Sequence, residues 1–154
     1  MNKKWYLLIF ALLLLGIQAI RIDKTNPEVK PEKDFIKVTS TPDEVATILK
    51  AACYDCHSNQ TVYPWYSNIA PVSWYIKNHV NEARGRVNFS NWADYPTEKA
   101  LRKLKACYKD IEEGEMPLSV YKMAHSQAKL SEDQAKKLTQ WFLTVSENIN
   151  QEKK

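Results

Sequence analysis

With 154 residues and only three glycines, the chain has room for one domain of ordinary size, and the scarcity of glycine favours helices over a turn-rich β fold. The formal net charge of +4 comes mostly from the first 24 residues, so the rest of the chain is close to neutral. This balance excludes the broad basic surface that a nucleic-acid-binding protein needs.

The N-terminal segment, residues 1–21, is apolar between charged ends. Positive charge at residues 2–4 precedes a run from Trp5 to Ile20 that is apolar apart from Gln18, and Arg21 closes the run. This pattern predicts an export signal or a membrane anchor. As a helix the run would reach roughly 24 Å, short of a hydrocarbon core of about 30 Å. Because a cleavage site is poorly formed, we expect an uncleaved anchor in preference to a cleaved signal.

Residues 22–40 are expected to form a tether, because prolines and alternating charges there follow neither helical nor strand periodicity. Phe35, Ile36 and Val38 would also allow this segment to pack across the domain. The domain itself is assigned to residues 41–147. Residues 148–154 form a polar tail that is expected to fray.

The first helix of the domain has clear start signals. Thr41 is expected to cap it, with Pro42 at the first helical position. An apolar stripe at helical spacing follows, formed by Val45, Ile48, Leu49 and Ala52. The stripe predicts an amphipathic helix that runs directly into Cys53.

The most specific feature of the chain is Cys53-Tyr54-Asp55-Cys56-His57. Cys-x-x-Cys-His is the attachment sequence of c-type haem, in which two thiols bond to the haem and the histidine binds the iron. A redox disulfide would need a preceding strand, and zinc would need two more ligands, which the lone Cys107 and two distant histidines do not supply. The motif therefore predicts one covalent haem c, held by Cys53, Cys56 and His57. Such attachment takes place outside the bacterial cytoplasm, in agreement with an export segment.

The stretch from Thr61 to Trp92 is rich in aromatic residues, and a helix is expected after Pro71. Each aromatic side chain taken singly fits an ordinary core, but together they suit the broad apolar lining of a haem pocket. Arg84 and Arg86 are candidate partners of the haem propionates, with plain surface solvation as the alternative.

A third helix is expected from near Thr97 to Gly114, followed by Met116 and a proline in a loop. A methionine in this setting is typical of a second axial haem ligand, and its soft sulfur raises the reduction potential. Met116 is therefore the predicted sixth ligand. The alternatives are a core role for Met116, or ligation by Met123, His79 or His125.

The final helix is expected to start at Ser131, with Gln134 three residues after this cap. Its apolar stripe is Ala135, Leu138, Phe142 and Val145. The pattern as a whole predicts an all-α, cytochrome c-like domain around one covalently bound haem, after an N-terminal membrane segment.

Over roughly residues 40–145 the chain resembles the bacterial haem-binding domain family, whose members are small, exported, cytochrome c-like proteins with one haem. The resemblance rests on the attachment motif and on residues 63–66, 68–71, 79–80 and 88–92, together with Met116, Pro117, Tyr121 and His125. It implies haem binding and a periplasmic setting, and it says little about the physiological partner.

Two functions follow from these features. The first is an electron carrier in the bacterial periplasm, anchored to the inner membrane by residues 1–21, with a six-coordinate haem that docks with redox partner proteins. The second is a haem-based sensor or binding module, in which the sixth iron position is weak or open. A peroxidase is a weaker third option, because it would need an open iron and a distal acid–base group such as His79 or His125.

Overall fold

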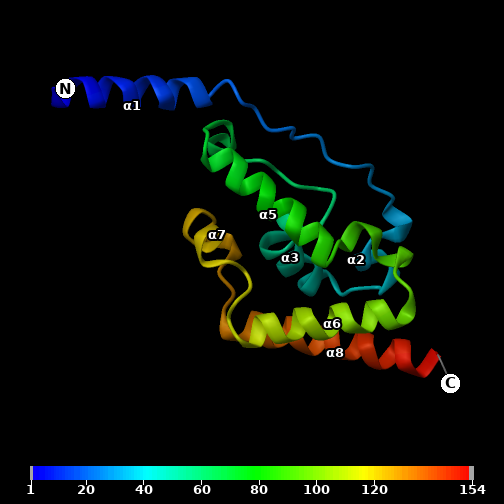
Figure 1. Cartoon of the computed structure of the whole chain (residues 1–154). Coiled ribbons are helices and arrows are strands. Elements are labelled where there is room, and N and C mark those ends of the chain that lie inside the picture. Colours follow the sequence, from blue (N-terminus) through cyan, green and yellow to red (C-terminus); the bar gives the residue numbers. More distant parts are fainter. Residues whose placement is uncertain (1, 153–154) are drawn as a thin grey trace.

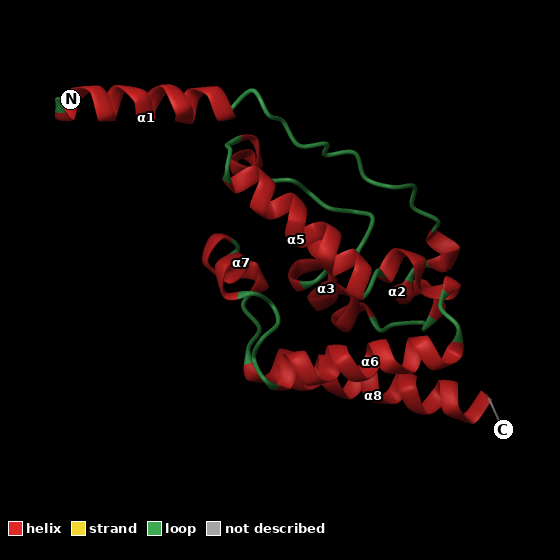
Figure 2. Ribbon diagram, in the orientation of Figure 1, coloured by secondary structure: helices red, strands yellow, loops and turns green. Residues whose placement is uncertain are grey.

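Every regular element in residues 2–152, the part of the chain that the structure describes, is helical (Figures 1 and 2). The structure is a computed structural model. It confirms the prediction of an all-α fold. The α-helices are α1 (Lys3–Ile17), α2 (Phe35–Val38), α3 (Asp43–Ala52), α4 (Tyr54–His57), α5 (Val72–Arg86), α6 (Thr97–Glu112), α7 (Ser119–Ala124) and α8 (Glu132–Glu152). Short 3₁₀ helices lie between them: η1 (Pro31–Lys33), η2 (Trp65–Asn68), η3 (Phe89–Asp94) and η4 (Ser126–Ala128).

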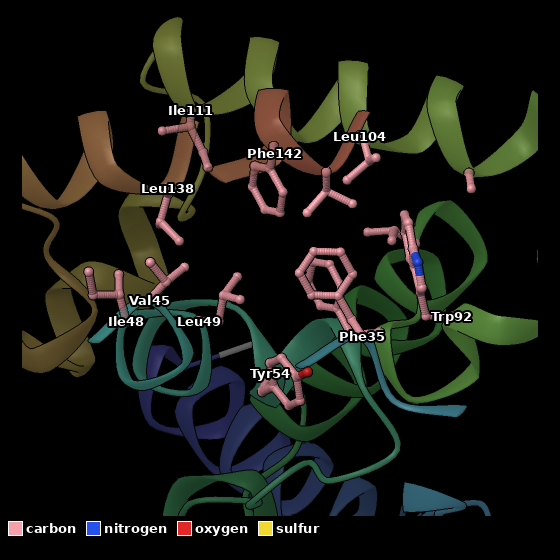
Figure 3. Packing of buried hydrophobic residues seen from close by; sticks show 14 residues of the cluster. Phe35, Val45, Ile48, Leu49, Tyr54, Trp92, Leu104, Ile111, Leu138 and Phe142 are labelled. Atoms are coloured by element: carbon pink, nitrogen blue, oxygen red, sulfur yellow. The ribbon is translucent and has the colours of Figure 1, made fainter. Parts of the chain in front are cut away.

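Helices α6 and α8 form an antiparallel pair along one side of the molecule (Figure 1). Helix α3 packs against α8, so the apolar stripes of the three helices share one core. In Figure 3, Leu104 and Ile111 of α6 and Leu138 and Phe142 of α8 point into the same core, with the α3 side chains across from them. Burying these stripes is what holds such short helices, because isolated helices of this length are marginal in water.

The start of α3 differs from the prediction. The helix begins at Asp43, one residue later than expected, and the hydroxyl of Thr41 makes no capping hydrogen bond. The Thr41 hydroxyl forms a hydrogen bond of 2.7 Å with Thr39 Oγ1 and accepts one of 3.2 Å from the indole N–H of Trp141. A long-range partner has therefore replaced the local cap. The capping box of α8 does form, with Gln134 N donating to Ser131 Oγ and Ser131 N donating to Gln134 Oε1.

Residues 18–40 follow the surface of the domain instead of standing clear of it. The side chain of Asn26 is held by Thr61 and Arg84, and Asn59 Nδ2 donates to the carbonyl of Glu28. At the end of this stretch, Phe35 of α2 is completely buried. The segment expected to be a tether thus contributes a side chain to the core, which is one of the two arrangements that its sequence allowed.

Helix α1 leaves the body of the molecule with its apolar side chains exposed (Figure 1). It ends at Ile17, three residues before the end of the apolar run, and the side chain of Gln18, the next residue, donates to the carbonyl of Ala70 in the domain. No helix within residues 2–152 combines the length and the apolar character needed to cross a membrane.

Candidate haem-binding site

The attachment motif occupies a kink between two helices. Helix α3 ends at Ala52, the backbone of Cys53 departs from helical geometry at φ −123° and ψ −39°, and α4 then covers Tyr54–His57. The amide of His57 donates to the carbonyl of Cys53 at 2.9 Å, so this single turn is closed. The motif therefore lies on a short, ordered turn. The amphipathic helix leads directly into Cys53, as its sequence predicted.

The side chain of Tyr54 anchors this turn to the core. Its hydroxyl donates to Asp34 Oδ1 at 2.8 Å, and both residues are buried. Its ring stacks on Phe89 with centroids 5.5 Å apart, and its carbonyl accepts the hydroxyl of Ser58. Burial and the hydrogen bond to Asp34 raise the pKa of Tyr54 far above its usual value, so the phenol stays protonated and keeps donating. The second residue of the motif is thus a structural anchor.

His57 is held in one orientation by the end of α5. Its Nδ1 lies 3.1 Å from the carbonyl oxygen of Ala83 and 3.2 Å from that of Val87. Two carbonyls can only accept, so Nδ1 carries the proton and Nε2 keeps its lone pair. Burial lowers the pKa of His57, whereas its hydrogen bonds to the two carbonyls raise the pKa by a smaller amount. The net lowering favours the neutral ring. A neutral imidazole whose other nitrogen donates to a carbonyl is the form in which histidine binds metals.

Beside this histidine lies an apolar cavity of about 460 Å³ between the motif, α6 and α8. Its volume falls in the usual range for small-molecule and cofactor sites. Cys53, His57 and Met116 all line it, so the structure brings together three of the four predicted site residues. The apolar part of the wall includes Ala52, Val87, Phe89, Ala106, Ile111, Leu130 and Phe142.

Basic side chains also line this cavity: Arg86 at the end of α5, and Lys99, Arg102 and Lys103 on α6. Lys103 donates to the carbonyl of Arg86 and lies 4.6 Å from the centre of the Tyr95 ring. The sequence identified Arg86 but missed the three α6 residues, although their i, i+3, i+4 spacing was the available signal. Arg84, the other candidate, is engaged elsewhere, because its guanidinium donates to Ser58, Asn26 and Thr61.

Cys56 lines a second cavity of about 180 Å³, between α4, α5 and α7. His79 and His125 line this second cavity and not the first. Nε2 of His125 lies 2.6 Å from the hydroxyl of Tyr66, and its ring stacks on Tyr121 at 4.4 Å. Nδ1 of His79 lies 2.9 Å from the carbonyl of Tyr75. Met116 does not line this second cavity, so the two histidines and Met116 belong to different cavities.

No disulfide joins the cysteines within residues 2–152. Burial raises the pKa of Cys53 to about 12 and that of Cys56 to about 11. The third thiol, Cys107, lines the larger cavity from α6, and burial together with the charge of Asp110 raises its pKa to about 12. A raised pKa keeps a thiol protonated at neutral pH, and the thiolate is the reactive form of cysteine.

The donor set, the apolar wall and the basic side chains fit a haem: an imidazole nitrogen for the iron, an apolar lining for the porphyrin and cations for its carboxylates. The comparison with known families agrees, because the haem-binding domain family matches residues 12–144. The chain therefore belongs to this family and is a haem-binding protein. Searches of curated proteins and of solved structures found no match to the chain.

Proposed function

We propose that the protein carries one haem c, attached through Cys53 and Cys56 and ligated by His57, in a cytochrome c-like domain. The observation that carries this proposal is the imidazole of His57, fixed by two carbonyls in the wall of an apolar cavity that it shares with Cys53. When bound, the haem supplies an iron that takes up and releases single electrons.

The residues of the chain have separable tasks in this site. His57 presents a neutral nitrogen to the iron. Phe89 and Phe142, both buried in the cavity wall, would exclude water from a bound haem. Arg102, with the other cations of the cavity wall, binds the haem carboxylates, since Arg pairs strongly with such groups.

Met116 is the proposed sixth ligand. It lies in the same cavity as His57, whereas His79 and His125 line the smaller one. The loop that holds it is ordered by Gly114, whose φ of 71° lets the chain turn after α6, and by the amide of Met116, which donates to the carbonyl of Asp110 at 3.0 Å.

The function proposed for this site is electron transfer in the bacterial periplasm, with redox partner proteins that dock briefly. Residues 1–21 serve as the export segment and hold the protein at the inner membrane. Ligation of the iron by a second protein side chain would favour an electron carrier, whereas an open iron position would favour a sensor of small ligands.

Covalent attachment is tested by extracting the purified, exported protein with acid and acetone. We expect the colour to stay with the polypeptide and the intact mass to rise by one haem. The variant with both Cys53→Ala and Cys56→Ala should lose the pigment, while Cys107→Ala, a cysteine in the same cavity, should keep it. Pigment that partitions into the solvent from the parent protein would overturn covalent attachment and leave a non-covalent haem.

The sixth ligand is tested by three single variants. Met116→Ala should turn the low-spin ferric spectrum high-spin, allow carbon monoxide to bind the reduced protein, and lower the reduction potential because the soft sulfur is lost. His79→Ala and His125→Ala should leave all three properties unchanged. Loss of the low-spin spectrum in a histidine variant alone would show bis-histidine ligation. Carbon monoxide binding by the parent itself would favour the sensor function.

A further inference from the structure

Exposed apolar side chains gather at the end of the domain where α1 leaves it. We call this surface the apolar end; it consists of Val62, Trp65, Ile69, Val72, Tyr75, Val120 and Met123. Trp65 is 75% exposed and Met123 is 84% exposed, although both are large. Single exposed apolar residues are ordinary on a protein surface, but a group of this size marks a contact with something apolar.

The apolar end is one surface, although its residues come from three parts of the chain. Helix η2, the start of α5 and α7 meet around the second cavity, which Val62, Val72, Tyr75 and Val120 all line. The contact between Tyr66 of η2 and His125, at the end of α7, ties the outer two elements together. Trp65 packs edge-on against the ring of Tyr66, with centroids 5.7 Å apart.

Helix α1 is fixed to this surface and does not hang from a free linker. Gln18, one residue after α1, makes a reciprocal pair of hydrogen bonds with Ala70: its Nε2 donates to the carbonyl at 3.0 Å, and its Oε1 accepts the amide at 2.9 Å. The indole N–H of Trp74 donates to the carbonyl of Ile20, and Arg21 donates to the carbonyl of Asn68. These bonds, which we call the latch, set the direction in which α1 leaves the domain.

We propose that the apolar end rests on a lipid bilayer, beside the point where α1 enters it. The occupant follows from α1 itself, which is apolar, exposed along its length and latched to the border of this surface (Figure 1). Insertion of α1 into lipid would bring the protein surface beside its C-terminal end to the headgroup layer. Trp and Tyr are the residues that favour this layer, and the apolar end contains Trp65 and Tyr75.

The charges at the border agree with a lipid surface. Lys24 Nζ donates to Asn68 Oδ1 at 2.6 Å, so Lys24 and Arg21 hold two cations beside the apolar end. Asp23 is the acidic group between them, and its carboxylate accepts the amide of Thr25, which lowers its pKa. The net positive charge attracts anionic headgroups.

The test uses the full chain with its haem, reconstituted into vesicles of phosphatidylethanolamine and phosphatidylglycerol that contain a photoreactive phospholipid. After illumination, mass spectrometry locates the lipid adducts along the chain. We expect adducts in α1, in residues 62–76 and in residues 118–124. Peptides around Val38 and Leu143, whose side chains are also apolar and exposed but lie elsewhere, should carry none. The variant with Trp65→Ser and Met123→Ser should lose the adducts outside α1 while keeping its haem spectrum.

The outcomes separate this proposal from the anchoring of residues 1–21, on which it rests. Adducts in α1 alone would confirm the anchor and overturn the proposed resting surface. Adducts spread equally to the Val38 and Leu143 peptides would overturn it as well, because contact would then be unspecific. Absence of all adducts would overturn both proposals. Protein–protein cross-links through Trp65 would assign the apolar end to a second copy of the chain instead of lipid.

Discussion

Replacing Phe35 with alanine is the most direct test of the packing that joins the N-terminal segment to the domain. Phe35 is completely buried, and its ring centroid lies 4.8 Å from Trp92, 5.3 Å from Phe89 and 5.9 Å from Phe142. A buried Phe→Ala change costs about 3–5 kcal/mol, and each aromatic pair contributes on the order of 0.5–1.5 kcal/mol beyond its area. Because the measured cost of Phe→Ala already includes such ring contacts, the three contacts of Phe35 place it in the upper part of that range, and we expect Phe35→Ala to reduce the free energy of unfolding by about 4–5 kcal/mol.

A loss of this size is a large part of the free energy of unfolding, which is typically about 5–15 kcal/mol for a domain. The assay is guanidinium unfolding of the haem-loaded protein, followed by far-ultraviolet circular dichroism, with a lower midpoint and an unchanged slope expected. Because Phe89 and Phe142 line the haem cavity, the haem absorption band should shift in the same variant. The matched control is Val38→Ala on the same short helix, where the exposed side chain should change stability by less than about 0.5 kcal/mol.

A loss below about 1 kcal/mol for Phe35→Ala would refute this reasoning. It would mean that residues 22–40 are a tether after all and that the domain starts near residue 41. A large loss predicts in addition that deletion of residues 1–40 gives a chain that does not fold.

Three further predictions follow from the site. Tyr54→Phe should cost about 2 kcal/mol in the same unfolding assay, because a hydrogen bond to the buried carboxyl group of Asp34 is lost; an unchanged midpoint would show that the bond contributes nothing. Cys107 should resist iodoacetamide at pH 8 in the folded protein and react after unfolding, since burial raises its pKa to about 12; rapid modification of the native protein would contradict that burial. Replacing Lys99 and Arg102 with glutamine should lower the reduction potential by about 20 mV for each charge removed, measured by spectroelectrochemical titration. This shift corresponds to roughly 0.5 kcal/mol, the energy of one solvent-exposed ion pair. A rise in the potential would contradict the assignment of these residues to the haem carboxylates.

Much of the site was readable from the sequence because its signals are local. The spacing of Cys53, Cys56 and His57, and the stripe that leads into them, depend on neighbours along the chain and on helical periodicity. The same holds for the cap at Ser131, whose partner is three residues away. Local signals of this kind survive folding when no distant group competes for them.

The features that sequence reasoning missed depend on distant partners. Thr41 does not cap α3, because Trp141, a hundred residues later, takes its hydroxyl. Arg84 does not face the larger cavity, because carbonyl and side-chain oxygens from residues 26–61 bind its guanidinium. That His125 and Met116 line different cavities is a property of the tertiary arrangement, and no spacing in the sequence encodes it.

Helix α5 rigidly connects the latch beside α1 to the site of His57. It begins at Val72, two residues after the latch at Ala70, and Ala83 in its final turn and Val87 directly after it supply the carbonyls that hold His57. Fifteen residues of helix measure about 22 Å, a length that cannot change without breaking the helix. On the proposed lipid surface, α5 would therefore set a fixed height for the iron above the membrane. Redox partners whose own cofactors stand at a similar height would be selected by geometry, before any side-chain contact is made.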